Sequence, residues 1–428
     1  MNTIDGGVTT PKGFKATGTH CGIKKERLDL AMIYSERPAI AACAYTQNKM
    51  RAAPIELMIQ RHSDKLQAFI INSGNANAIT GPQGMKDAIA MSEMAAKALS
   101  LDPVHVGVAS TGVIGRFLPM DKMVPGIESI AAQLGSGREY DHRANMAILT
   151  TDKTIKEAAC QVTLKDGTVV TIAGMAKGSG MISPSMKTKH ATTLSFVTSD
   201  AVLTKAPEWK WQECINKSFN MINVDGDQST NDISVFMANG AAGGKPVDDN
   251  PEYWNGVLYV LQSLAKQVVL DGEGATKLIE LKVTGAKNDR EARTTGRWII
   301  SSSLVKTAIF GADPNFGRVL AALGNSGSEF DIDKLKLTIG SNGDEVVLFE
   351  GGVPQVKPCS ETEVKARRLL SDHNISMASK RGPVWTPEAR AAPRATRMAI
   401  STRVTNRKKV LWAMTNPRLV LPMAGLIS

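Results

Sequence analysis

Residues 178–196 read GSGMISPSMKTKHATTLSF, and they join a glycine-rich loop to an apolar run that continues as LSFVTSD. The small and β-branched residues of this run predict a buried strand. A threonine hydroxyl becomes a good nucleophile when it is N-terminal, because its own α-amine, with a pKa of about 7.7–8.0, then serves as the base. The Ala191-Thr192 junction before the strand therefore suggests a cleavage site, although threonine is also ordinary filling in a strand.

Runs typical of strands and of helices alternate along the 428 residues, which predicts a mixed α/β fold. We expect strands at residues 28–35, 67–74, 104–112, 194–200, 278–285, 335–340 and 345–352, and a hairpin over 161–174 that turns at Asp166 and Gly167. We expect helices at residues 84–100, 206–219, 253–272 and 361–373. Because the chain exceeds the usual length of one domain, two subdomains are expected.

The net charge of +10 is concentrated at the C-terminal end. Residues 380–428 hold ten Lys and Arg and one acid, Glu388, so the rest of the chain is nearly neutral. A neutral body gives no electrostatic reason to bind nucleic acid. We expect residues 377–428 to be a basic tail that is either disordered or the product of a shifted reading frame.

Cysteine and histidine usage argues against a metal centre. The five cysteines are scattered without a CxxC pair, and the six histidines form no cluster with metal-ligand spacing. No apolar run approaches the roughly 20 residues that a membrane span requires. These features predict an enzyme of the cytoplasm without a metal.

Four loops combine small and polar residues that suit a binding site. NSGNANA (72–78) and STGVIG (110–115) follow predicted strands and suit either an oxyanion hole or simple tight turns. DGDQSTND (225–232) is interpreted as a polar turn rather than a metal site, because it lacks the ligand pattern of a calcium loop. DGEGATK (271–277) is a helix C-cap or a loop that offers the Glu273 carboxylate to a substrate ammonium.

Ten collinear motifs together resemble the bifunctional glutamate N-acetyltransferase and ornithine acetyltransferase family of arginine biosynthesis. They include GVTTPKGFKATGTHCGIKK, INSGNANAITGPQG, VASTGVIGRFLPMDK, GMAKGSGMISPSM, ATTLSFVTSDA, SFNMINVDGDQSTNDISVFMANGAAG and LVKTAIFGADPNFGRVLAALG. The resemblance covers about residues 7–376. It implies a mixed-sheet α/β sandwich of the DmpA-like, N-terminal-nucleophile type.

The resemblance further implies a chain that cleaves itself before Thr192. Residues 1–191 would become an α chain and residues 192–376 a β chain, with two copies of each in a heterotetramer. The new N-terminal threonine would accept acetyl from N2-acetylornithine and pass it to glutamate. Some family members also use acetyl-CoA, and no other cofactor is implied.

The motif matches also assign roles to single residues. By resemblance, Thr111 and Gly112 form the oxyanion hole, and the residues that contact substrate are Thr151 or its neighbour Thr150, Lys177, Thr192 and Glu273. A substrate with an α-carboxylate and a side-chain ammonium needs one cation and one anion. Our hypothesis is that Lys177 binds the carboxylate and Glu273 the ammonium.

The sequence departs from the family pattern at the cleavage site. Four residues, 187–190 (KTKH), stand between Met186 and Ala191, where the family has none. Thr188 keeps the family's spacing from Lys177, whereas Thr192 keeps the preceding alanine and the following TLSF. We favour Thr192 as the nucleophile and keep Thr188 as the alternative.

Three other functions stay open on the sequence alone. A related amidohydrolase or aminopeptidase would pass the acyl group to water. The insertion and an atypical C-terminus would also suit an inactive homologue. A nucleic-acid binder would need the basic tail as its binding arm.

Overall fold

The computed structural model describes residues 1–61, 63–185, 193–380 and 395–403. They form two compact units: Met1–Glu273 with Met398–Ile400, and the remaining described residues from Gly274 onward. The expected mixed α/β fold with two subdomains is confirmed. The division into an α chain, a β chain and a tail stays a prediction.

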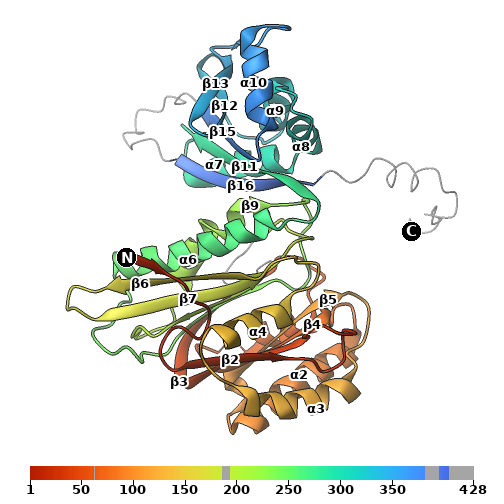
Figure 1. The fold of residues 1–428 in the computed structure, drawn as a ribbon, viewed down its shortest axis with the longest axis vertical. Coiled ribbons are helices and arrows are strands. Elements are labelled where there is room, and N and C mark those ends of the chain that lie inside the picture. The colour runs from red at the N-terminus through yellow and green to blue at the C-terminus, as the bar shows by residue number, and fades with distance from the viewer. Residues whose placement is uncertain (62, 186–192, 381–394, 404–428) are drawn as a thin grey trace, which may run out of the picture. The chain divides into compact units, whose positions relative to one another are not determined.

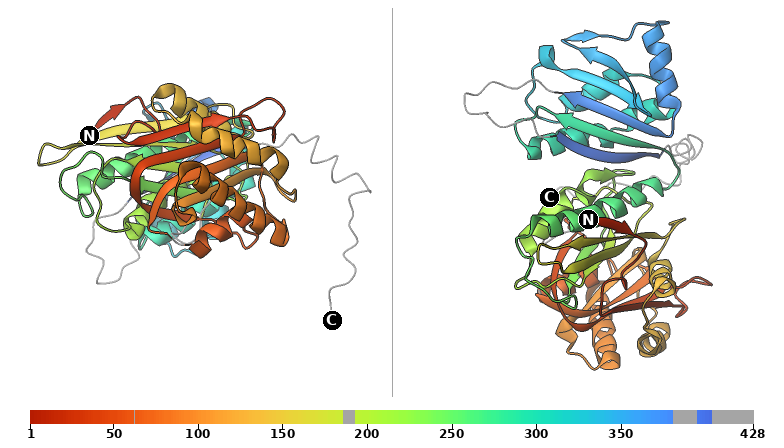
Figure 2. Two further views of the ribbon diagram at one scale, coloured as in Figure 1. Left: turned by 90° about the horizontal axis from the view of Figure 1, so that it is seen from below. Right: turned by 60° about the vertical axis from the view of Figure 1, so that its left-hand side comes forward.

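The first unit is built on one nine-stranded sheet (Figure 1). Its strands run in the order β1-β6-β7-β8-β10-β3-β4-β5, with β2 paired to β3, and β8–β10 and β4–β5 are the parallel pairs. The strands are β1 (Asn2–Ile4), β2 (Phe14–Thr19), β3 (Leu30–Tyr45), β4 (Lys65–Asn75), β5 (Val106–Val113), β6 (Lys156–Thr163), β7 (Val169–Lys177), β8 (Leu194–Ser199) and β10 (Ile233–Ala238). In Figure 2 the N-terminus is seen beside β6, with which β1 pairs.

Helices cover this sheet. They are α1 (Ala53–Arg61), α2 (Gly81–Leu99), α3 (Met120–Ile130), α4 (Arg138–Ile148), α5 (Glu208–Asn216) and α6 (Pro251–Leu270). Helix α4 packs on β2 and β3, α2 on β5, and α6 on β6 and β7. In the described part of the chain, no helix combines the length and the apolar character needed to cross a membrane.

Strand β8 follows directly on the predicted cleavage segment and lies in the middle of the sheet. All six of its residues are buried between the antiparallel β7 and the parallel β10. Its polar side chains find partners: the Ser195 and Ser234 hydroxyls are 2.5 Å apart, and the Thr198 hydroxyl donates to the Val8 carbonyl at 2.8 Å. A strand held on both sides gives its first residues a fixed position.

Helix α6 brings a second functional loop to the same unit. It starts after Asn250, whose side chain caps the first turn by accepting from the N–H groups of Glu252 and Tyr253, and Pro251 suits the first helical position. Its buried face recurs every three or four residues from Tyr253 to Val269 and packs on β6 and β7. The helix ends at Leu270, so the loop with Asp271 and Glu273 follows at a defined point.

The second unit carries a smaller sheet. Its elements are β11 (Ala275–Thr284), α7 (Asp289–Ser301), α8 (Ser303–Phe310), α9 (Phe316–Gly324), β12 (Lys336–Ser341), β13 (Asp344–Glu350), β14 (Val353–Pro354), α10 (Glu361–Ser371) and β15 (Asn374–Lys380). The strand order is β14-β13-β12-β15-β11, and α7 packs on β11 while α10 packs on β12. The Lys277 ammonium donates to the Ile309 and Leu370 carbonyls and so caps α8 and α10.

Two strands lie in the region expected to be a disordered tail. Strand β15 continues to Lys380, and β16 (Ala395–Arg403) pairs in parallel with β9 (Ile222–Asn223) through Ala399 and Ile400. Backbone pairing holds these two segments in extended structure. The expectation that residues 377–428 are a basic tail, disordered or the product of a shifted reading frame, stays a prediction. Residues 381–394 and 404–428 lie outside the described residues.

Candidate active site

The structure brings Thr111 and Lys177 together, although 66 residues separate them. Lys177 is the last residue of β7 and pairs with Leu194 of β8, while Thr111 lies near the end of β5. The Lys177 Nζ donates to the Thr111 Oγ1 at 3.2 Å, and both side chains are buried. Two of the predicted site residues thus meet beside the start of β8.

Gly112 stands where only glycine fits. Its φ is +139°, and a Cβ there would lie 2.3 Å from the carbonyl carbon of Gly74 and 2.5 Å from the nitrogen of Asn75. Gly74 and Gly112 are paired across β4 and β5, where the register shifts at Asn75. The close approach of the β4 backbone therefore requires glycine at this position. Without a Cβ, the chain after Thr111 can turn with no steric clash.

Asn231 ties the polar loop 225–232 to the two loops expected to form an oxyanion hole. Its Nδ2 donates to the carbonyl oxygens of Ala76 at 2.5 Å and Ser110 at 2.8 Å. In the same polar loop, the Asp225 carboxylate accepts from the N–H groups of Met181 and Ile182, as expected of a polar turn. Within the described residues, no group of three or more His, Cys, Asp or Glu side chains is placed to hold a metal ion.

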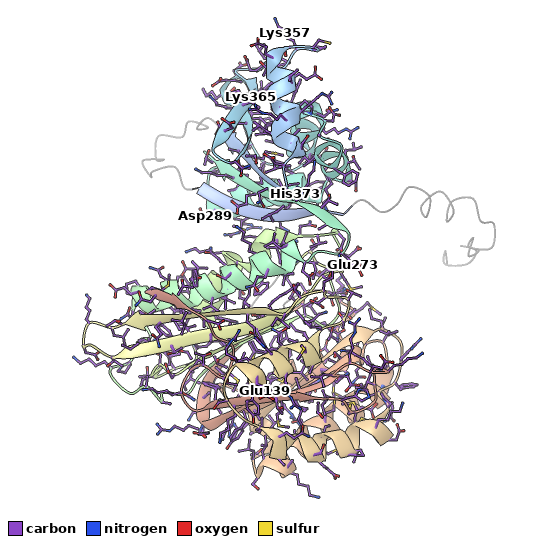
Figure 3. All side chains as sticks on the ribbon, viewed as in Figure 1. Glu139, Glu273, Asp289, Lys357, Lys365 and His373 are labelled. Carbon is purple, nitrogen blue, oxygen red and sulfur yellow. The ribbon has the colours of Figure 1, made fainter. Side chains whose placement is uncertain are left out.

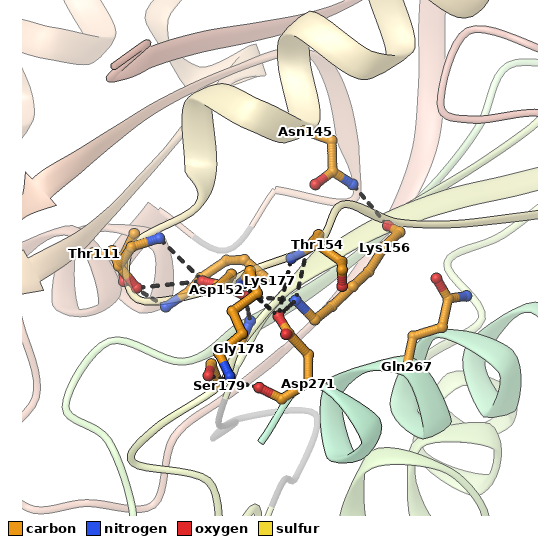
Figure 4. A network of polar contacts seen from close by, with 12 residues as sticks. Thr111, Asn145, Asp152, Thr154, Lys156, Lys177, Gly178, Ser179, Gln267 and Asp271 are labelled. Carbon is orange, nitrogen blue, oxygen red and sulfur yellow. Dashed lines mark hydrogen bonds and ion pairs between the residues drawn. The ribbon is translucent and has the colours of Figure 1, made fainter. Parts of the chain in front are cut away.

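A buried network of ion pairs lies next to Lys177 and contacts the glycine loop at Gly178 (Figure 4). The Lys156 ammonium is fully buried and lies 2.7 Å from both the Asp152 Oδ1 and the Asp271 Oδ2. The Asp152 Oδ1 also accepts from the Gly178 N–H at 2.6 Å, and the Asp271 Oδ2 accepts from the Lys153 N–H at 2.9 Å. One lysine therefore fixes the loop after α4, the glycine loop after β7 and the loop after α6.

The electrostatics of this cluster favour an ionised Asp152. Burial opposes ionisation, but the ammonium groups of Lys177 and Lys156 outweigh it and hold the pKa of Asp152 well below its usual range. Burial also lowers the pKa of Lys177, although Asp152 and Asp232 favour its charged form. Charge pairing thus balances the cost of burying these groups beside the cavity.

Glu273 lies just beyond the C-terminal end of α6 (Figure 3). Its N–H donates to the Ser179 carbonyl at 2.9 Å, and the Ser179 hydroxyl donates to the Asp271 carbonyl at 2.7 Å. A Cβ on Gly180 would lie 2.7 Å from the Glu273 Oε2, so the carboxylate rests against this glycine. The glycine loop and the predicted ammonium-binding residue are therefore adjacent.

Thr151 is exposed in the loop that Asp152 anchors. Its neighbour Thr150 is half-buried, and the Thr150 N–H donates to the Asp152 Oδ2 at 3.0 Å. Both candidates of the sequence analysis therefore belong to the loop fixed by the ion network. Of the two, Thr151 is the more exposed residue.

These elements enclose a small cavity. Its lining comprises Thr111, Lys177, Gly178, Gly180, Met181, Ile182, Thr193, Leu194, Ser229, Asn231 and Asp232. The predicted nucleophile Thr192, the alternative Thr188 and the scissile partner Ala191 lie outside the described residues. A larger depression of about 470 Å³ lies by the N-terminus of α6, but none of the predicted site residues lines it.

Sequence reasoning missed several buried residues of the site. Asp152, Lys156, Asp232 and Asn231 were not singled out, although Asp232 and Asn231 belong to a loop that was. Lys24 was also missed: its Nζ donates to the Leu149 carbonyl at 2.6 Å, and burial lowers its pKa to about 8. A charged side chain inside an otherwise strand-like stretch, as at Lys156, is the signal that could have found one of them.

The family model described as the ArgJ family matches residues 15–387, which is most of the chain. The chain belongs to the ArgJ family. Relatives named "Arginine biosynthesis bifunctional protein ArgJ" include those of Caldanaerobacter subterraneus, 45% identical over 82% of this chain and 87% of the relative, and Listeria monocytogenes, 42% identical over 90% and 96%. The chain is therefore an enzyme of arginine biosynthesis, as the motif resemblance predicted.

Solved structures of ArgJ-type chains are similar in sequence. The arginine biosynthesis bifunctional protein argJ of Bacillus halodurans is 44% identical over 43% of this chain and 96% of that chain, with a TM-score of 0.42. The ornithine acetyltransferase of Mycobacterium tuberculosis, solved with ornithine, is 41% identical over 42% and 96%, with a TM-score of 0.40.

Replacing Lys156 tests the ion network of this ArgJ-family protein. Lys156→Met leaves the Asp152 and Asp271 carboxylates buried without their cation, so the free energy of unfolding in urea should fall by about 3–5 kcal/mol. Lys217→Met removes an exposed i,i+4 pair with Glu213 and should cost less than about 1 kcal/mol. Equal losses in the two variants would contradict the structural role of the network.

Proposed function

We propose that this enzyme moves an acetyl group from N2-acetylornithine to glutamate through an acetyl-Thr192 intermediate, after self-cleavage between Ala191 and Thr192. The observation that carries the proposal is the meeting of Thr111, Lys177 and the buried start of β8 at one cavity. Acyl transfer from an N-terminal threonine requires a positioned hydroxyl with the α-amine as its base, and donors that stabilise the oxyanion.

The transfer needs only the Thr192 hydroxyl and α-amine and the two substrates. The Thr192 Oγ attacks the acetyl carbonyl carbon and its proton passes to the Thr192 α-amine. Collapse of the tetrahedral intermediate breaks the C–N bond, and that proton leaves with the amine of ornithine. The amine of glutamate then attacks the threonine ester, and the Thr192 hydroxyl is restored as N-acetylglutamate forms.

In this proposal, Thr111 and Gly112 stabilise the oxyanion of both tetrahedral intermediates. The Thr111 Oγ1 accepts from the Lys177 Nζ, which leaves the hydroxyl proton of Thr111 to donate in turn. The nearby ammonium makes that hydroxyl a stronger donor. Loss of one oxyanion donor typically raises the barrier by about 2.7–4 kcal/mol.

Recognition of the substrate rests on the residues around the cavity. Lys177 supplies the cation for the α-carboxylate, and Glu273, resting against Gly180, supplies the anion for the ammonium of ornithine. Thr151 offers a hydroxyl from the anchored loop. The proposal extends to acetyl-CoA as a second acetyl donor, to an assembly of two α and two β chains, and to action in the cytoplasm.

The nucleophile is tested with two threonine variants. The wild-type chain should separate into two bands, and the intact mass of the larger product should match a chain that starts at Thr192. The cleaved enzyme should form N-acetylglutamate from N2-acetylornithine and glutamate. Thr192→Ala should stop both the cleavage and the transfer, whereas Thr188→Ala should leave both unchanged. Release of free acetate without glutamate transfer, or a chain that starts at Thr188, would overturn the assignment.

The role of Glu273 is tested by removing its charge. Glu273→Gln should raise the KM for N2-acetylornithine about tenfold to a hundredfold, since a hydrogen bond to a charged group contributes about 1.5–3 kcal/mol. Glu252→Gln, an exposed residue in the first turn of α6, serves as the control with an unchanged KM. An unchanged KM in Glu273→Gln would remove Glu273 from the substrate site.

A further inference from the structure

Asp232 lies next to Thr193, the described residue that follows the predicted nucleophile in the sequence. It directly precedes β10, whose first residue, Ile233, pairs in parallel with Leu194 of β8. The Ile233 N–H donates to the Thr193 carbonyl at 2.8 Å, so the pairing with β10 includes Thr193, the residue before β8. Asp232 and Thr193 therefore lie next to each other, and the nitrogen of Thr193 is bonded to Thr192.

The side chains at this point are buried and incompletely paired. Asp232 is 5% exposed and Thr193 is 2% exposed, and both line the cavity with Lys177. Among the described residues, the Asp232 Oδ2 and the Thr193 Oγ1 have no hydrogen-bond partner. A buried carboxylate oxygen without a donor is costly to keep, so its position in the cavity calls for a function.

The environment gives the Asp232 carboxyl a high proton affinity. Burial raises the pKa of Asp232 well above its usual range, although the Thr193 N–H, the Lys177 ammonium and the Ser229 hydroxyl favour the ionised form. A carboxylate whose proton affinity is raised in this way is a stronger base than an exposed one.

Self-cleavage poses a problem that the transfer reaction does not. Before the chain is cut, the Thr192 nitrogen is part of the peptide bond to Ala191, so its lone pair is delocalised into the carbonyl group and cannot act as the base. The first attack by the Thr192 hydroxyl therefore needs a proton acceptor from elsewhere in the chain. Lys177 is a poorer choice than Asp232, because the proposed function uses it as a charged ammonium, which has no lone pair to accept a proton.

We propose that Asp232 is the proton acceptor and donor of the self-cleavage before Thr192, an inference that rests on the proposed function. Asp232 thereby acts one step earlier than the Thr192 α-amine, which takes over as the base once it has been released.

Asp232 accepts and returns one proton at each stage of the cleavage. The Thr192 Oγ attacks the Ala191 carbonyl carbon and its proton passes to the Asp232 carboxylate. The C–N bond then breaks, and the Asp232 carboxyl returns the proton to the Thr192 nitrogen, which leaves an ester between Ala191 and Thr192. Water hydrolyses the ester to the Ala191 carboxylate and the Thr192 hydroxyl, with Asp232 again accepting and releasing the proton.

Thr193, the second residue after the predicted cleavage point, has an unusual backbone conformation. Thr193 has a φ of +102°, a conformation that β-branched residues rarely adopt. Strain of this kind persists only where the surrounding structure enforces it, and the Thr193 carbonyl is held by the Ile233 N–H at the start of β10. The same contact therefore holds the strained residue and presents Asp232 to it.

The test follows the rate at which newly synthesised full-length protein is cut, by denaturing gel and intact mass. Asp232→Asn should slow cleavage by about a hundredfold or more, the usual contribution of a positioned acid-base group. Asp232→Glu keeps a carboxyl and should cleave faster than Asp232→Asn. Asp227→Asn, an exposed acid in the same loop, is the matched control and should cleave at the wild-type rate.

The outcomes separate this inference from the proposed function. A folded Asp232→Asn protein, with the wild-type circular dichroism spectrum, that is cut at the wild-type rate would overturn the role of Asp232 alone. If Asp232→Asn does not fold, Asp232→Ala with added formate decides: formate-dependent cleavage supports the role, and its absence contradicts it. A wild-type chain that is never cut before Thr192 would instead contradict the proposed function.

Discussion

The ammonium group of Lys156 and the two carboxylates it holds are the constraint on which the site depends. Asp152 and Asp271 come from loops that are far apart in the sequence, and Lys156 lies 2.7 Å from each. Through Gly178, the same cluster fixes the glycine loop that follows β7. Because burying three charges is costly unless each is paired, the loops have little freedom to separate.

The proposed chemistry needs this rigidity because its residues come from separate strands. Thr111 comes from β5, Lys177 from β7, and Asp232 from the start of β10, while β8 leads directly from the predicted nucleophile. About 1 Å of misplacement can cost on the order of a hundredfold in rate. The four inserted residues 187–190 stand before the nucleophile, on the side of the chain that cleavage would release from β8.

Much of the fold could be predicted where the local pattern is strong. The runs that form β4, β5, β8 and α6 were predicted, as was the hairpin of β6 and β7, which turns at Gly167 with a φ of +83°. Strand β10 was missed because ISVFMA is short, lacks alternation and is buried on both faces.

Some residues of the candidate site were named from the sequence, but by motif resemblance rather than by a local pattern. Thr111, Gly112, Lys177 and Glu273 were assigned by motif resemblance, and the structure places Thr111 against Lys177 and Glu273 against the glycine loop. The ion network could not be predicted, since Lys156 and Asp271 are 115 residues apart and nothing in the local sequence marks them as partners.

The most direct test of the central claim is the mass of the chain that begins at Thr192 after brief exposure to N2-acetylornithine. The account predicts that this chain gains the mass of one acetyl group, that peptide mapping places the acetyl group on Thr192, and that glutamate removes it. Transfer to glutamate without any acetylated intermediate, or an acetyl group on another residue, would contradict it.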